Sequence, residues 1–288
     1  ITAENGKPLK WARSEVARAA STFRWAAEEA RRWNGELMRL DTEAATAGRL
    51  GVVRRFPHGP VLGIAPFNFP LNLVLHKVAP ALAVGNSVVL KPAPQTPLTA
   101  RLLQEVFAEA GLPEGALEVC HCPVPLAEKM VRDERFAMVS FTGSAKVGWH
   151  IKDVAGRKKV ALELGGNGAI IVAEDADLEH AATRCVRGGV VYGGQYCIGV
   201  QRILVHRSVA ERFTRLLVDK VKACRVGDPL QEGIDVGPVI DEGAAVRIQS
   251  WVDEALSQGA RLLCGGKRER AVVQPTVLTD TRPGMKVE

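Results

Sequence analysis

Two short segments of this chain carry residue types that can do covalent chemistry on a carbonyl group. Cys197 follows the flexible run Gly193–Tyr196, and Glu163 opens the glycine-bounded turn Glu163-Leu164-Gly165-Gly166. A cysteine thiolate can attack a carbonyl carbon, and a carboxylate can activate the water that later releases the acyl group. A single cysteine more often only packs in a core. The interpretation therefore depends on the other motifs of the chain.

Three further motifs lie where a strand gives way to a turn or helix. In Pro66-Phe67-Asn68-Phe69-Pro70, the Asn68 amide could donate to a developing oxyanion, or could form an Asx turn or helix cap. Lys91 ends the apolar run Val88–Leu90, where it could meet a ribose or phosphate, or simply be solvated. Phe141-Thr142-Gly143-Ser144 joins a strand to a helix, a place that attracts phosphate, although its glycine spacing is not the usual dinucleotide fingerprint.

Short apolar strands alternate with helices through most of the chain, which predicts a parallel, doubly wound sheet. A long amphipathic helix over 11–33 comes first. We predict strands at 61–65, 87–90, 117–120, 138–141, 169–173 and 202–206, and helices at 71–83, 97–110, 126–132, 175–187 and 208–223. The last helix is expected to open with a capping box, Ser208 to Glu211. The glycine cluster Gly165–Gly168 predicts a domain boundary near 165.

Composition excludes several classes of protein. The 288 residues are 47% hydrophobic and 24% charged, as in a globular protein, and no apolar run approaches the roughly 18 residues of a membrane span. The net charge of +6 is spread among acidic partners, so we expect no nucleic-acid partner. Six irregularly spaced cysteines favour a reducing, cytoplasmic location. Cys120-His121-Cys122 predicts no metal site, because its cysteines should alternate across a strand and no second ligand pair follows.

The ordered set of motifs resembles the aldehyde dehydrogenase superfamily, in its NAD(P)-dependent, non-acylating type. The resemblance spans essentially the whole chain, including Glu109–Pro113 and Pro275–Leu278. It implies a Rossmann-like, parallel-sheet cofactor domain over 1–165, with a bridging strand segment near 50–57. A second α/β catalytic domain, incomplete at its C-terminal end, is expected over 166–288.

The resemblance also implies a role for each reactive residue. Cys197 matches the nucleophile, which forms a thiohemiacetal with the aldehyde and then, after hydride transfer, a thioester. Asn68 matches the side chain that stabilises the oxyanion together with the backbone N–H of Cys197. Glu163 matches the base that activates water for hydrolysis of the thioester.

The cofactor implied by the resemblance is NAD or NADP. Lys91 matches a contact to the adenosine ribose, and Ser144 matches a contact to the pyrophosphate. Pro94 stands where many NAD-preferring members have a glutamate that repels a 2′-phosphate, so we expect NADP to be tolerated or preferred. Further cofactor contacts are expected from Ile64, Pro66, Phe67, Thr142, Gly143, Leu164 and Gly165.

The expected substrate is a small polar aldehyde or a semialdehyde. By resemblance, Leu73, His76, Tyr196 and Ile198 line its pocket. Family members are longer at both ends, so we expect this chain to be the central part of an enzyme that is a homodimer or homotetramer at full length. Two alternatives remain: a coenzyme-A-acylating dehydrogenase, which needs no water-activating Glu163, and a catalytically incomplete fragment that retains only nucleotide binding.

Overall fold

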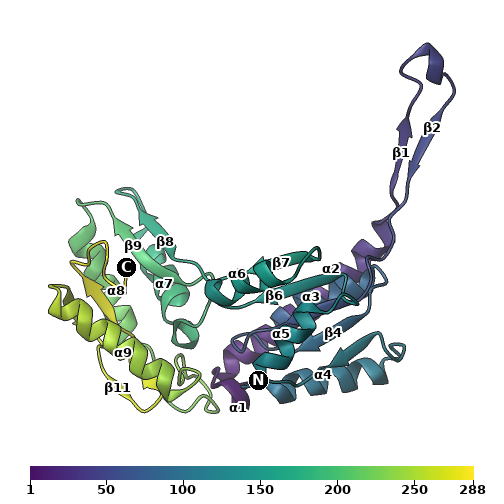
Figure 1. Ribbon diagram of the computed structural model, residues 1–288. Helices are drawn as coiled ribbons and strands as arrows, with labels where there is room; N and C mark the ends of the chain where they lie inside the picture. The colour runs from purple at the N-terminus through teal and green to yellow at the C-terminus, as the bar shows by residue number, and fades with distance from the viewer. The chain divides into compact units, whose positions relative to one another are not determined.

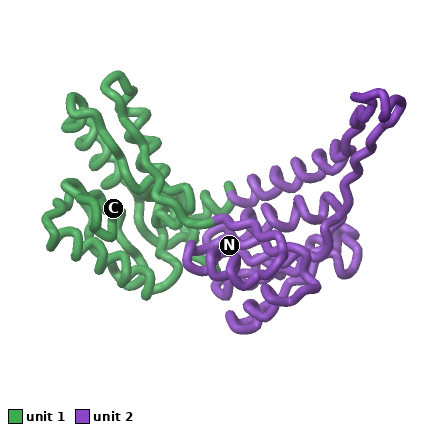
Figure 2. The backbone as a smooth tube through the Cα atoms, turned by 45° about the horizontal axis from the view of Figure 1, so that its top comes forward, with its two compact units in different colours: residues 1–14, 164–288 green, residues 15–163 purple.

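The computed structural model describes residues 1–288, which divide into two compact units (Figure 2). One unit comprises residues 15–163, and the other comprises residues 1–14 together with 164–288. The chain thus passes between the units twice, between Ser14 and Glu15 and between Glu163 and Leu164, whereas the glycine cluster predicted a single boundary near 165. Residues 1–14 also differ from the prediction, which assigned them to the first domain.

Polar contacts hold the N-terminal segment, residues 1–14, against residues 164–288 of the same unit. The Leu9 amide donates to the Pro229 carbonyl at 3.1 Å, and the Trp11 indole donates to the Asp235 carbonyl at 3.1 Å. Lys10 forms an ion pair with the Asp235 carboxylate. These partners lie more than two hundred residues away along the chain, so no local pattern could have predicted them.

The unit of residues 15–163 is built on a five-stranded sheet in the order β5-β4-β3-β6-β7, with every neighbouring pair parallel. The predicted parallel, doubly wound sheet is confirmed. The strand order reverses between β3 and β6, and in open parallel sheets ligands bind at such a reversal. The strands are β3 (Val61–Ile64), β4 (Val88–Lys91), β5 (Leu117–Val119), β6 (Met138–Thr142) and β7 (Lys159–Glu163).

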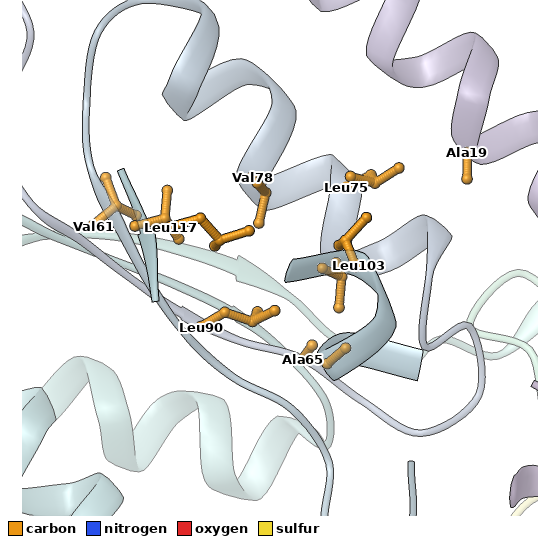
Figure 3. Close-up of a cluster of buried hydrophobic side chains, with 11 residues drawn as sticks. Ala19, Val61, Ala65, Leu75, Val78, Leu90, Leu103 and Leu117 are labelled. Atoms are coloured by element: carbon orange, nitrogen blue, oxygen red, sulfur yellow. The ribbon is translucent and has the colours of Figure 1, made fainter. Parts of the chain in front are cut away.

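Helices cover this sheet and form its core. Side chains from α2, α3 and α4 pack on the apolar residues of β3, β4 and β5 (Figure 3), where Val61, Leu90 and Leu117 meet Val78 and Leu103. Helices α5 and α6 pack against each other. The helices are α2 (Leu9–Arg32), which begins in the other unit, α3 (Asn72–Ala83), α4 (Pro97–Glu109), α5 (Val124–Arg132) and α6 (Ala145–Val154).

A two-stranded antiparallel ribbon, separate from the main sheet, is formed by β1 (Glu36–Arg39) and β2 (Leu50–Val53) (Figure 1). A short 3₁₀ turn, Ala44–Thr46, lies between the two strands. The predicted strand segment near 50–57 therefore ends at Val53 and has a partner that the sequence did not indicate. Both strands expose apolar side chains to solvent, with Leu37 71% and Val52 70% exposed.

The unit of residues 1–14 and 164–288 contains the parallel pair β8 (Gly168–Val172) and β9 (Val200–Val205). Helices α7 (Leu178–Gly189) and α8 (Ala210–Lys222) pack on this pair through Ala182 and Phe213. The antiparallel pairs are β10 with β13 and β11 with β12. The remaining elements are α1 (Thr2–Asn5), the 3₁₀ turn Val191–Gly194, α9 (Glu242–Ser257), β10 (Arg261–Cys264), β11 (Arg268–Glu269), β12 (Val272–Val273) and β13 (Val277–Thr279).

The predicted capping box of α8 is wrong. The helix begins at Ala210 with Val209 as its N-cap, and no side chain caps it. The Ser208 hydroxyl instead lies 2.8 Å from His206 Nδ1. None of the helices is both long enough and apolar enough to cross a membrane.

Candidate functional site

The carboxyl ends of the parallel strands bring several of the predicted residues to one edge of the sheet. Strand register pairs Ile64 with Lys91 and with Phe141, and it pairs Thr142 with Glu163. Asn68 follows β3 and Ser144 follows β6, the two strands between which the order reverses. This is the position at which open parallel sheets bind ligands.

The turn after β6 has the form of a phosphate-binding loop. The Gly143 amide donates to the Glu163 carbonyl at 3.0 Å. A Cβ on Gly143 would lie 2.5 Å from Cζ of Phe141, so a larger residue would require the Phe141 ring to shift. Helix α6 begins at Ala145 and has no acidic residue in its first turn, so no carboxylate of that turn competes with an anion for the positive end of the helix dipole. The loop therefore fits the pyrophosphate of a dinucleotide.

Ser144 is the N-cap of α6. Its hydroxyl accepts a hydrogen bond from the Val147 amide at 3.4 Å, a long contact. The side chain is exposed. Ser144 therefore caps the helix, and its hydroxyl also remains accessible to a ligand.

Lys91 is buried at the end of β4, so the alternative of a solvated lysine is wrong. Its ammonium group donates to the Pro92 carbonyl at 3.0 Å. Pro94, three residues further on, is exposed and brings no carboxylate to this edge of the sheet.

Sequence reasoning missed Lys77, a buried cation at the same edge. Its ammonium group donates to the Thr142 hydroxyl at 2.6 Å and lies 3.4 Å from the Ser140 hydroxyl. Burial lowers the pKa of Lys77 to about 8, while the Glu163 carboxylate raises it in part. The signal in the sequence was a lysine inside the apolar run that forms α3.

His76 is exposed on α3, one position before Lys77. Its Nε2 lies 3.3 Å from the Asn72 side-chain amide. Partial burial lowers the pKa of His76, with further lowering by Arg18 and Lys77, and only Glu163 acts in the opposite direction. The imidazole therefore favours its neutral form more than an isolated histidine does.

The loop that carries Asn68 is tied to the structure on either side. The Ala65 amide donates to the Lys91 carbonyl at 3.0 Å, and the Leu73 amide donates to the Phe69 carbonyl at 3.0 Å. Prolines at 66 and 70 restrict the backbone between them. Asn68 itself is half-buried.

In the other unit, three consecutive left-handed residues precede Cys197. Tyr192, Gly193 and Gly194 have φ values of 53, 63 and 72°. The strained residue of the three is Tyr192, and its ring is fully buried beneath the Lys7 ammonium group, 4.7 Å from the ring centre. The Gln195 amide donates to the Tyr192 carbonyl at 3.2 Å and its oxygen accepts from the Ile240 amide at 2.9 Å.

Cys197 is the only exposed cysteine of the six, all of which are free thiols. Burial raises the pKa of Cys185, Cys224 and Cys264, so each of these is a poorer nucleophile than an ordinary thiol. Accessibility therefore singles out Cys197.

The Cys120-His121-Cys122 motif differs from its predicted form. The thiols of Cys120 and Cys122 interact with each other, and burial, reinforced by Cys120, raises the pKa of Cys122. Strand β5 ends at Val119, so both cysteines lie in the segment after the strand and not within it, as the prediction had assumed. Among residues 1–288, no three His, Cys, Asp or Glu side chains are placed together to hold a metal ion.

The predicted site residues are divided between the two units. The unit of residues 15–163 carries a larger group that gathers at its sheet edge and on α3: Ile64, Pro66, Phe67, Asn68, Leu73, His76, Lys91, Pro94, Thr142, Gly143, Ser144 and Glu163. Leu164, Gly165, Tyr196, Cys197 and Ile198 lie in the other unit, where Ile198 is exposed beside Cys197.

Comparison with known proteins gives one consistent family. The Aldehyde dehydrogenase family matches residues 1–288. The chain is 44% identical over 288 residues to 3-sulfolactaldehyde dehydrogenase of Priestia aryabhattai. This match covers 100% of this chain and 60% of the relative. It thus spans about 60% of the length of such relatives.

Two solved structures are similar to this chain over nearly all of its length. One is aldehyde dehydrogenase 21 from Physcomitrella patens, in complex with the reaction product succinate, with a TM-score of 0.96 and 44% identity over 99% of this chain and 60% of that one. The other is NADP-dependent glyceraldehyde-3-phosphate dehydrogenase from Bacillus halodurans C-125 complexed with NADP, with a TM-score of 0.95, 40% identity and the same coverage.

Proposed function

Because this chain belongs to the aldehyde dehydrogenase family, we propose that it oxidises an aldehyde to a carboxylic acid, with NAD or NADP as the hydride acceptor. The observation that carries this proposal is the row of residues at the sheet edge. Asn68 and Ser144 follow the two strands where the order reverses, and Glu163 pairs with Thr142 beside them. An amide donor, a carboxylate base and an anion-binding loop are what such a reaction requires.

Cys197 supplies the nucleophile. Its thiolate forms a bond from sulfur to the aldehyde carbon, and the carbonyl oxygen becomes an oxyanion. The Asn68 side-chain amide and the Cys197 backbone N–H donate hydrogen bonds to that oxygen. The exposure of Cys197 supports this role, since an aldehyde must reach the sulfur directly.

The cofactor is held by residues of the sheet edge and of the turn that follows it. Lys91 would contact the adenosine ribose, and Gly143 and Ser144 would hold the pyrophosphate at the start of α6. A bound NAD(P)⁺ would supply the acceptor for the hydride that leaves the carbon attached to the Cys197 sulfur, and the sulfur would then carry a thioester. Further contacts come from Ile64, Pro66, Phe67, Thr142, Leu164 and Gly165.

Glu163 completes the reaction as a base. Its carboxylate takes a proton from water, the resulting hydroxide attacks the thioester carbon, and the carbon–sulfur bond breaks to release the carboxylic acid. Glu163 is exposed at the end of β7, where water can reach it. A coenzyme-A-acylating reaction would not need this step.

The substrate is a small polar aldehyde or a semialdehyde. His76 and Leu73 on α3, with Tyr196 and Ile198 beside the nucleophile, are the residues that we assign to it. The mixture of a neutral imidazole, a phenol and two aliphatic side chains suits a short molecule with one polar end. The similarity to 3-sulfolactaldehyde dehydrogenase of Priestia aryabhattai supports this class.

The protein acts as a homo-oligomer, a dimer or tetramer, in the cytoplasm. The exposed apolar side chains of β1 and β2 support association between copies, because large apolar surfaces are seldom left in water. Six free thiols support a reducing compartment. Light scattering tests the oligomeric state, and a monomer at micromolar concentration would contradict the proposed association.

The activity is tested by the formation of reduced nicotinamide with a panel of short aldehydes. Carboxylate- or sulfonate-bearing aldehydes are compared with uncharged ones of the same length, each with NAD and with NADP. Turnover that is abolished by Cys197→Ala and unchanged in Cys264→Ala is the expected result. Absence of turnover with every aldehyde, or full activity in Cys197→Ala, would refute the proposal.

A further inference from the structure

Glu15 is a buried carboxylate that has no part in the reaction described above. It lies on α2 and is 2% exposed. Its Oε1 accepts hydrogen bonds from the Leu71 amide at 2.9 Å and from the Asn72 amide at 3.1 Å. These two amides lie at the start of α3, where backbone N–H groups have no partner within the helix.

Helix α3 has no cap of its own. Its N-cap residue is Leu71, whose side chain cannot accept a hydrogen bond, and the residue before it, Pro70, has no N–H. A carboxylate in the interior is costly unless it is hydrogen-bonded. At this place its Oε1 accepts from two backbone N–H donors at the positive end of the α3 dipole, which compensates for the burial of the side chain. Glu15, which lies 56 residues before Leu71 in the sequence, thus supplies the hydrogen-bond acceptor that the N-cap residue of α3 lacks.

The helix start held by Glu15 is also the end of the loop that carries Asn68. Asn68 lies three residues before Leu71, and the loop's other end is fixed by the hydrogen bond from the Ala65 amide to the Lys91 carbonyl. The contacts of Glu15 therefore set where the backbone leaves the loop and enters α3. A shift there moves Asn68, because the prolines leave little freedom to absorb it.

We infer that Glu15 is a positioning residue for Asn68, and that it acts by capping α3 at the exit of the Asn68 loop. This inference rests on the proposed function, in which the Asn68 amide must meet the oxyanion. An error of about 1 Å in such a group can lower the rate by about 10²-fold. The role of Glu15 is thus to hold the donor in place, without contact to the substrate.

The test compares Glu15→Ala, Glu15→Gln and the control Glu28→Ala, which removes an exposed glutamate from the same helix. Glu15→Ala is expected to lower kcat by about 10- to 10²-fold, with KM for NADP changed by less than about twofold. Glu15→Gln keeps an acceptor oxygen and should recover part of kcat. Glu28→Ala should behave as the wild type.

A double-variant cycle separates positioning from a general loss of structure. If Glu15 acts through Asn68, adding Glu15→Ala to Asn68→Ala should lower kcat by less than about twofold further. Independent, multiplying effects would overturn the inference, as would a Glu15→Ala variant with the kcat of the wild type.

Hydrogen exchange of the Leu71 and Asn72 amides distinguishes failure of this inference from failure of the proposed function. Faster exchange at both amides is expected in Glu15→Ala, whether or not the protein turns over aldehydes. Unchanged exchange would overturn the capping role. An inactive wild type whose amides exchange faster in Glu15→Ala would instead refute the catalytic role of Asn68 that the inference requires.

Discussion

The ammonium group of Lys77 lies 2.6 Å from the hydroxyl of Thr142, and this hydrogen bond ties helix α3 to the end of strand β6. Thr142 is in turn paired with Glu163 on the neighbouring strand β7. One buried cation therefore joins the helix that follows the Asn68 loop to the strands that carry the anion-binding turn and the proposed base. Helix α3 and strand β6 were predicted from the sequence, but the hydrogen bond that links them was not.

Lys77 makes the stability of the protein depend on pH in a definite direction. Burial lowers its pKa in the folded state from 10.5 to about 8. Between these values the unfolded chain binds a proton that the folded chain does not, so the free energy of unfolding rises with pH. Below pH 8 both states are protonated, and the full penalty for burying the charge is present.

Replacing Lys77 with Met removes this titration. Relative to Lys77→Met, the wild type should gain up to about 1.4 kcal/mol per pH unit in the free energy of unfolding between pH 8 and 10.5. Urea unfolding of both proteins across this range measures the difference, and the exposed Lys146→Met serves as the control. A difference that does not change with pH would contradict the lowered pKa.

Asn68→Ala should lower kcat by about 10²–10³-fold, because one hydrogen bond to the oxyanion is lost. KM for the cofactor should change little. Asn68→Asp is the matched control for shape, since an aspartate of the same size cannot donate a hydrogen bond when ionised. If Asn68→Asp retained the wild-type kcat, Asn68 would not be the oxyanion donor.

Pro94→Glu should shift cofactor preference toward NAD. A carboxylate at this exposed turn would accept hydrogen bonds from the ribose hydroxyls and repel a 2′-phosphate. The ratio of kcat/KM for NAD to that for NADP is expected to rise by about tenfold or more, equivalent to about 1.4 kcal/mol. Pro94→Gln separates the charge from the loss of proline, and equal ratios in the two variants would reject the electrostatic explanation.

Most of the fold could be predicted from sequence because its signals are local. The strands at 61–65, 87–90, 117–120, 138–141, 169–173 and 202–206 are all present, within a few residues. Strand β7 was missed because Lys159–Glu163 has only a short apolar centre between charged ends. The capping box at Ser208 failed because the cap hydroxyl has a competing partner in His206.

The position of a site residue could be predicted most directly where the residue ends a strand. Lys91, Thr142 and Glu163 each end a strand, so the parallel sheet alone brings them to one edge. Lys77 and Glu15 were not predicted, because their partners lie more than fifty residues away and only tertiary packing defines them.

The central claim is that Cys197 carries the acyl group and that Glu163 is needed to release it. In Glu163→Gln, mixing with an aldehyde substrate and cofactor should give one burst of reduced nicotinamide, about equal to the enzyme concentration, followed by very slow turnover. Peptide mass spectrometry of the quenched protein should then find the acyl mass on Cys197 and on none of the other five cysteines. A burst without an adduct on Cys197, or an adduct on another cysteine, would contradict the account.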